Sequence, residues 1–247
     1  MVAKKKITSP KKESKENLKD PVYLTFFATF LFLSGTTLIT LLAALSADGV
    51  NQVYLKQALV SETAVNIIAS VTYYYFMIYL YADKLTLENV TPIRYLDWAF
   101  TTPLLLLSFV LVTKYTSSEG ESINLETLIY IVLLNLGMLY FGYVGEKGIM
   151  NFWHAFILGF ACYGGLIYLL WDKYVDGENE GAKILLYIFA GVWGLYGLAY
   201  LLPMREKNIA YNILDLISKA GFGVYIWLKL ITESPKQYAS VHTTAAP

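Results

Sequence analysis

Seven long apolar runs constrain this chain more than any other feature of its sequence. Each run is long enough to cross a hydrocarbon core of about 30 Å as an α-helix. Because lipid offers no hydrogen-bond partner to a backbone group, helices are the expected element for runs of this length. The sequence therefore predicts an all-α membrane protein, a bundle of seven transmembrane helices. The runs cover approximately residues 22–47, 58–82, 92–113, 124–144, 148–171, 182–202 and 208–231.

The composition agrees with a multi-span membrane protein and excludes other classes. Apolar residues make up 56% of the chain, charged residues only 15%, and the mean hydropathy is +0.48. A net charge of zero gives no sign of a nucleic-acid partner. A single cysteine, Cys162, and two histidines leave too few ligands for a disulfide framework or a metal site. The partner that the composition does predict is the lipid bilayer.

The polar segments set the expected domain limits. Residues 1–20 form a polar, lysine-rich leader that we expect to be disordered. Residues 21–232 form the single seven-helix domain, and residues 233–247 form a polar tail. Short linkers separate the runs, and one of them is expected at "EKG", residues 146–148.

Two of the apolar runs carry charged residues, which are costly inside a membrane and usually mark function. The third run holds Arg94 and Asp97, with Thr101 one turn further on the same face. The seventh run holds Asp215 and Lys219. These four charges predict either a structural ion pair between helices or a functional centre. A neutral lysine amine is also the nucleophile that condenses with an aldehyde.

The motifs "RYLDWAFTTPLLLL" and "DLISKAGFG" resemble the third-helix and seventh-helix signatures of microbial (type 1) rhodopsins. The resemblance covers all seven runs and implies a bundle of the bacteriorhodopsin type. It further implies that Lys219 binds all-trans retinal covalently as a protonated Schiff base. By the same resemblance Asp97 is the counterion and proton acceptor, and Asp215 is the second counterion. Three residues are expected to support these counterions: Arg94, Thr101 and Tyr73.

The resemblance also implies a retinal-binding pocket, with two tryptophans, Trp98 and Trp193, on either side of the polyene. The other expected wall residues are aromatic, small or hydroxyl-bearing. They are Thr102, Leu105, Met138, Gly142, Trp153, Phe156, Phe160, Tyr196, Tyr200 and Ser218.

The chain departs from outward pumps of the bacteriorhodopsin type at the proton donor. The position eleven residues after Asp97, where those pumps have a carboxylate, is Ser108. The resulting Asp-Thr-Ser pattern resembles viral rhodopsins. The usual pair of extracellular release glutamates is also missing, and Arg205 and Lys207 fall near their place.

Glu62 is a candidate replacement for the missing donor. It lies eleven residues before Tyr73, and Ser108 lies eleven after Asp97, so on antiparallel helices both are about 16 Å toward the same side. We therefore expect Glu62 and Ser108 to meet in the cytoplasmic half-channel. Glu62 would act there as a proton donor or as a gate; the alternative is a solvated carboxylate at the headgroup level.

The resemblance predicts a photoreceptor that is not an enzyme, and three activities stay open. We favour a light-driven outward proton pump with Asp97 as acceptor. The alternatives are a light-gated cation channel, lined by polar residues such as Glu62 and Ser108, and a photosensor acting through a transducer. Family members commonly form trimers or pentamers, so a homo-oligomer is expected. The family places the N-terminus outside and the C-terminus in the cytoplasm, whereas the seven lysines of the leader favour the reverse.

Overall fold

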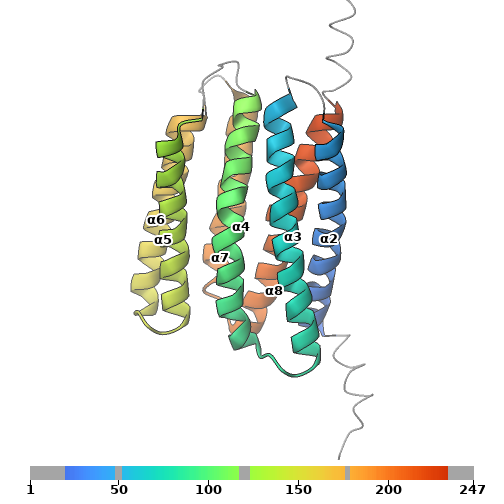
Figure 1. Cartoon of the computed structure of the whole chain (residues 1–247). Coiled ribbons are helices and arrows are strands. Elements are labelled where there is room, and N and C mark those ends of the chain that lie inside the picture. Colours follow the sequence, from blue (N-terminus) through green and yellow to red (C-terminus); the bar gives the residue numbers. More distant parts are fainter. Residues whose placement is uncertain (1–19, 48–51, 117–122, 176–178, 233–247) are drawn as a thin grey trace, which may run out of the picture.

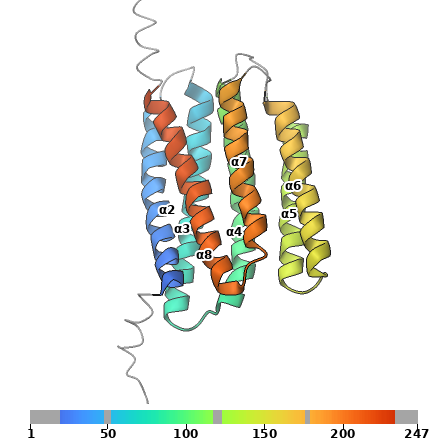
Figure 2. The same ribbon diagram turned by 180° about the vertical axis from the view of Figure 1, so that it is seen from behind.

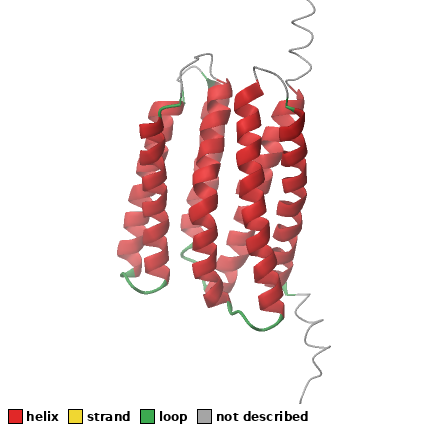
Figure 3. Ribbon diagram, viewed as in Figure 1, coloured by secondary structure: helices red, strands yellow, loops and turns green. Residues whose placement is uncertain are grey.

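The regular structure of this protein is helical throughout the residues described by the computed structural model, which are 20–47, 52–116, 123–175 and 179–232 (Figure 3). Six helices are long and apolar enough to cross a membrane. The seventh is interrupted by a turn of π-helix and continues to residue 232. The predicted seven-helix membrane bundle is thereby confirmed. The helices are α2 (Pro21–Ser46), α3 (Val53–Tyr81), α4 (Leu87–Thr116), α5 (Leu125–Glu146), α6 (Phe152–Tyr174), α7 (Glu180–Ala199), α8 (Met204–Asp215) and η2 (Leu216–Gly221).

The proposed leader, apart from Asp20, and the proposed tail lie outside the described residues. They stay predictions. Asp20 itself caps α2, because its carboxylate accepts a hydrogen bond from the backbone N–H of Val22 at 2.9 Å.

Several helices begin at residues that differ from the start of the predicted apolar run. Both α3 and α4 begin five residues before their apolar run, since polar residues can extend a helix past the hydrocarbon core. Helix α6 begins later than expected, at Phe152. Gly148 adopts a positive φ of 67° in the preceding turn, and the Asn151 side chain caps the helix through the N–H groups of Trp153 and His154.

The bundle has two ends, which we name by the caps found there (Figure 1). Helices α2, α4, α6 and α8 begin at the Asp20 end, and α3, α5 and α7 begin at the Gln52 end. Helices α5 and α6 lie on one side of the molecule, α2, α3 and the last helix lie on the other, and α4 and α7 lie between them (Figures 1 and 2). Residues from α3, α4 and the last helix therefore meet in the interior, where the charges of the sequence are found.

The last helix changes its winding where its buried lysine lies. Residues Leu216–Gly221 form a π-helical turn that contains Lys219. Such turns are rare and usually occur at functional sites, because the extra residue redirects the side chains that follow.

Candidate functional site

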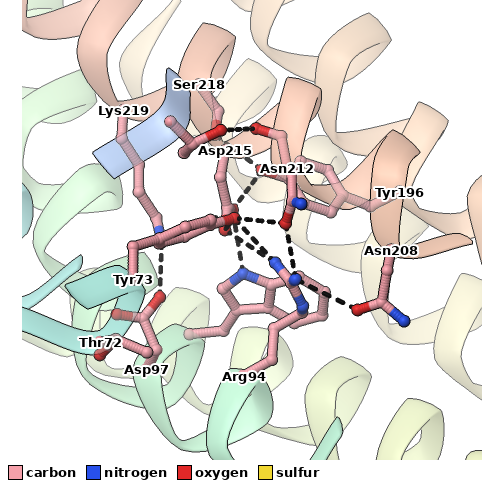
Figure 4. Close-up of polar contacts among 12 residues, drawn as sticks. Thr72, Tyr73, Arg94, Asp97, Tyr196, Asn208, Asn212, Asp215, Ser218 and Lys219 are labelled. Carbon is pink, nitrogen blue, oxygen red and sulfur yellow. Dashed lines mark hydrogen bonds and ion pairs between the residues drawn. The ribbon is translucent and has the colours of Figure 1, made fainter. Parts of the chain in front are cut away.

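Lys219 lies at the centre of the bundle in direct contact with two carboxylates (Figure 4). Its Nζ donates a hydrogen bond to Asp97 Oδ2 at 2.6 Å and lies 3.5 Å from Asp215 Oδ1. Lys219 and Asp215 are fully buried, and Asp97 is 4% exposed. The structure thus brings together the three residues that the sequence motifs selected, and their chemical roles stay predictions.

Asp215 is held by donors on both of its oxygens. The hydroxyl of Tyr73 donates to Oδ2 at 2.7 Å, and Arg94 Nη1 lies 3.3 Å from the same atom. Trp98 Nε1 donates to Oδ1 at 3.0 Å, and the Tyr196 hydroxyl does so at 2.7 Å. A carboxylate with this many donors is strongly stabilised in its charged form.

Arg94 spans from α4 to the last helix and joins two residues that the motifs did not identify. Its Nη2 donates to Asn212 Oδ1 at 2.7 Å and to Asn208 Oδ1 at 3.3 Å. Together with Asp215 and Lys219 these asparagines follow a helical spacing of three to four residues, so they share one face. That spacing was the available signal for Asn208 and Asn212.

Of three successive tyrosines in α3, only Tyr73 faces this network. Its side chain is fully buried, whereas Tyr74 is 52% and Tyr75 is 38% exposed. Its hydroxyl accepts a hydrogen bond from Arg94 Nη1 at 2.8 Å while donating to Asp215. Tyr73 therefore contacts Asp215 and Arg94, as expected for a residue that supports the counterions.

Asp97 is held by far fewer contacts than Asp215. Its Oδ1 makes no geometrically acceptable hydrogen bond with the described residues, although the Thr72 hydroxyl faces the carboxylate (Figure 4). The Thr101 hydroxyl donates to the backbone carbonyl of Asp97 at 2.9 Å and not to the carboxylate. Thr101 thus bonds to the backbone at Asp97 and leaves the carboxylate oxygen Oδ1 without a hydrogen bond to a described residue.

A largely apolar cavity extends from Lys219 between α4, α5, α6 and α7. One end is formed by Asp215, Ser218 and Lys219, and the rest of the wall is mainly aromatic or glycine. Eleven of the twelve expected wall residues line it. They are Trp98, Thr102, Leu105, Met138, Gly142, Phe156, Phe160, Trp193, Tyr196, Tyr200 and Ser218.

Trp153 is the exception and corrects the expected pocket. It is 58% exposed and does not line the cavity. The residues of α6 that line the cavity include Ala155, Phe156, Gly159 and Phe160. Trp153 lies in the first turn of α6, two turns before Phe160 and on nearly the same face, but its ring is exposed.

The cavity suits a long apolar ligand with one reactive end. Its side walls are rings, and its polar atoms gather around the amine of Lys219. Gly197 keeps the wall open for Phe160, because a Cβ there would stand 2.4 Å from the phenyl ring. A flat polyene with a terminal aldehyde fits this combination of shape and chemistry.

Toward the Gln52 end several buried polar atoms lack a hydrogen bond to any described residue. Glu62 is fully buried, and neither of its carboxyl oxygens has a geometrically acceptable hydrogen bond within the described residues. It faces the Ser108 hydroxyl, which donates a long hydrogen bond of 3.4 Å to the carbonyl of Ala58. Glu62 and Ser108 therefore meet as expected, and the carboxyl is not solvated at the surface.

The same side of α3 continues from Glu62 toward Lys219. Asn66 and Ser70 follow at intervals of four residues, and both are buried. Asn66 Oδ1 and Ser70 Oγ likewise lack a hydrogen bond to any described residue. This polar row extends from Glu62 to the neighbourhood of Tyr73.

At the Asp20 end the structure contains a buried carboxylate that the sequence motifs did not indicate. Glu146 closes α5 instead of lying in a linker, and its side chain is 2% exposed. It pairs with Lys207 Nζ at 3.5 Å. Arg205, by contrast, forms an exposed pair with Asp20 at 2.7 Å, and this hydrogen-bonded guanidinium lowers the pKa of Asp20.

Comparisons with known proteins give a consistent result. The family model described as "Bacteriorhodopsin-like protein" matches residues 24–233. A green-light absorbing proteorhodopsin of Gamma-proteobacterium EBAC31A08 is 30% identical over 196 residues, which cover 70% of this chain and 76% of that protein.

Solved structures show the same likeness in three dimensions. The crystal structure of viral rhodopsin OLPVRII superposes with a TM-score of 0.80 at 31% identity, covering 86% of this chain and 99% of that one. A blue light-absorbing proteorhodopsin from Med12 has a TM-score of 0.71 at 24% identity, covering 87% and 100%. At this lower identity, the likeness to the Med12 proteorhodopsin shows a shared fold and no more.

Proposed function

Because this chain belongs to the bacteriorhodopsin-like family of microbial, type 1 rhodopsins, whose members bind retinal, we propose that it is a light-driven pump that moves protons outward across its membrane. One observation carries the proposal. The buried Nζ of Lys219 donates at 2.6 Å to Asp97 Oδ2, a carboxylate that is free to accept a proton.

Lys219 is proposed to hold all-trans retinal covalently through Nζ, as a protonated Schiff base. When bound, retinal supplies light absorption and a light-driven change in the direction of the N–H bond. The cavity residues exclude water and fix the ligand, with Trp98 and Trp193 among its walls. Asp97 and Asp215 stabilise the positive charge at Nζ.

Asp97, and not Asp215, is proposed to take the proton from Nζ. Protonating Asp215 would weaken its ion pair with Arg94 and leave that guanidinium buried with less compensation. Among the described residues Asp97 has one charged partner in contact, Lys219, and transfer neutralises both members of that pair together. The transfer removes the positive charge beside Asp215 but leaves the Arg94–Asp215 ion pair in place.

Glu62 is proposed to return a proton to Nζ from the Gln52 end. A buried carboxyl with no cation in contact is least costly to bury in its neutral form. Glu62 would thus hold a proton at rest, and Asn66 and Ser70 mark a polar route toward Lys219. For outward transport the Gln52 end must face the cytoplasm and the Asp20 end the outside. Protease access to the leader of intact cells tests this orientation.

Proton transport is tested with retinal-supplied cells in unbuffered medium. Illumination should acidify the medium, a protonophore should abolish the signal, and Asp97→Asn should remove it. Wild-type protein that forms a pigment but causes no light-dependent acidification would contradict outward pumping.

A light-gated cation channel is a second candidate, favoured by the polar row of Glu62, Asn66 and Ser70 within the bundle. Voltage clamp separates the two activities. A pump gives an outward photocurrent without any gradient, whereas a channel current reverses with voltage and with the cation gradient. The expected homo-oligomer is a separate prediction, which native mass spectrometry checks.

A further inference from the structure

Glu146 has no part in the transfers proposed so far, yet it is built into a polar cluster at the Asp20 end. Its Oε1 accepts hydrogen bonds from the hydroxyls of Tyr95 at 3.2 Å and Tyr211 at 3.3 Å. Its Oε2 lies 3.5 Å from the ammonium of Lys207. The side chains of Glu146 and Lys207 are 2% and 10% exposed, so the carboxylate lies just beneath the surface.

Two of its partners also belong to the retinal site. Tyr95 and Tyr211 line the cavity that begins at Lys219. Both rings pack edge-on against Trp98, with centroids 5.1 Å and 4.9 Å away, and Trp98 donates to Asp215. The Glu146 cluster therefore joins the counterion network to the Asp20 end of the bundle.

Arg94 contacts the same junction from the inside. Its guanidinium carbon lies 5.6 Å from the centre of the Tyr211 ring while the group hydrogen-bonds Asn208 and Asn212. A proton leaving Asp97 toward this end thus has Arg94 on its way and Glu146 as a buried carboxylate near the surface.

The contacts of Glu146 define its resting charge. The groups that face it are the Lys207 ammonium and the hydroxyls of Tyr95 and Tyr211, and Tyr200 lies close by with Lys207 5.1 Å from its ring centre. An ion pair requires the carboxylate form. Glu146 is therefore a site that can receive a proton and not one that already holds a proton for release.

We propose that Glu146 is the proton-receiving site between Asp97 and the medium at the Asp20 end. The proposal rests on the outward proton transport proposed above. The proton leaves the Asp97 carboxyl and forms an O–H bond at Glu146; it then passes to water past Lys207. Because Glu146 starts without a proton, uptake at the Gln52 end precedes release at the Asp20 end.

The order of these events is measured with a pH-sensitive dye after a laser flash on the retinal-loaded protein. Wild type should take up a proton before releasing one. In Glu146→Gln release should slow about tenfold or more, as loss of a positioned proton-transfer group does, with pigment formation retained. The matched control is Glu126→Gln, which changes an exposed glutamate at the other end of the same helix and should leave the timing unchanged.

Lys207→Gln separates a proton site from a structural tie. Lys207→Gln removes the positive charge beside the receiving carboxylate, so the order of proton release and uptake should change. A purely structural contact between α5 and α8 predicts a lower thermal midpoint with the order of events unchanged. That result, or wild-type release in Glu146→Gln, would overturn the inference.

Infrared difference spectra provide a readout that does not depend on net transport. Illumination should produce a carbonyl band of a protonated glutamic acid that is absent in Glu146→Gln and present in Glu126→Gln. If wild type moves no protons across the membrane, outward pumping fails while this band still tests Glu146. An unchanged glutamic acid spectrum in Glu146→Gln contradicts the role of Glu146 even if pumping is established.

Discussion

The interior differs sharply on the two sides of Lys219. Toward the Asp20 end, Arg94, Asp215 and Tyr73 form a dense network in which each charge has several partners. Toward the Gln52 end, the polar atoms of Glu62 and Asn66 include three that lack a hydrogen bond to any described residue. Both regions are equally buried, so burial alone does not explain the difference.

The contrast follows from the cost of burying charge. A buried ion is tolerated when opposite charges and hydrogen bonds surround it, and a buried acid without such partners is favoured in its neutral form. One half of the interior is thus suited to carboxylates that carry a negative charge and stabilise the positive charge at Lys219. The other half is suited to an acid that gives one. Three substitutions inside the bundle and one at its surface compare these environments, and they are ordered by the size of effect that we expect.

Lys219→Ala should abolish the visible absorption band completely. Among the described residues that line the cavity, Lys219 is the only lysine. Absorption spectra after addition of retinal measure this. Lys56→Ala, which changes an exposed lysine of α3, is the control and should keep the band. A visible band of wild-type intensity in Lys219→Ala, sensitive to hydroxylamine, would show that the attachment site is elsewhere.

Asp215→Asn should destabilise the protein far more than Asp97→Asn does. Removing Asp215 takes from Arg94 its charged partner in contact, and breaking a buried pair in this way costs about 3–5 kcal/mol. After Asp97→Asn, Lys219 keeps Asp215 at 3.5 Å. Thermal denaturation of the two variants compares them directly, and equal midpoints would refute the stated difference between the carboxylates.

Glu62→Gln should leave the pigment intact and slow the recovery of the resting state by about tenfold or more, the lower range for loss of a positioned proton donor. Flash photolysis measures the recovery. Added azide should accelerate it, because a small mobile acid can replace the missing donor. Glu88→Gln alters an exposed glutamate and should have no effect. Recovery at the wild-type rate in Glu62→Gln would remove Glu62 from the return path.

The Asp20–Arg205 pair should give the smallest effect, because solvent screens an exposed ion pair. The Arg205 guanidinium lowers the pKa of Asp20 below its usual 3.8. The ion pair therefore stabilises the folded protein at neutral pH. This stabilisation is lost as the pH falls below about 4 and Asp20 becomes protonated. Arg205→Gln should lower the thermal midpoint slightly at pH 7 and not at all in strong acid. If the difference in thermal midpoint between wild type and Arg205→Gln grew on acidification, it would contradict the lowered pKa of Asp20.

Much of the fold and of the site was predictable from the sequence for one physical reason. A charge within an apolar run needs a partner, so the positions of Asp97, Asp215 and Lys219 in their runs are enough to predict that these residues meet. Length and apolarity likewise identified seven spans. The motif resemblance then supplied most of the cavity wall.

The residues that were missed or misplaced depend on depth and rotation, which composition does not specify. Glu146 looked like part of a polar linker, but α5 continues through it and places the carboxylate inside. Asn208 and Asn212 carry no charge, so the search for charged residues within apolar runs did not select them. Trp153 shares a helix face with Phe160, but it lies in the first turn of α6 with its ring exposed, which the motif did not specify.

Light-induced infrared difference spectroscopy of the retinal-loaded protein observes directly whether the proton from Lys219 arrives at Asp97. We expect a carbonyl band of a protonated aspartic acid that shifts with isotope-labelled aspartate and is lost in Asp97→Asn but not in Glu62→Gln. A photocycle that proceeds without this band, or a band that persists in Asp97→Asn, would contradict transfer from Lys219 to Asp97.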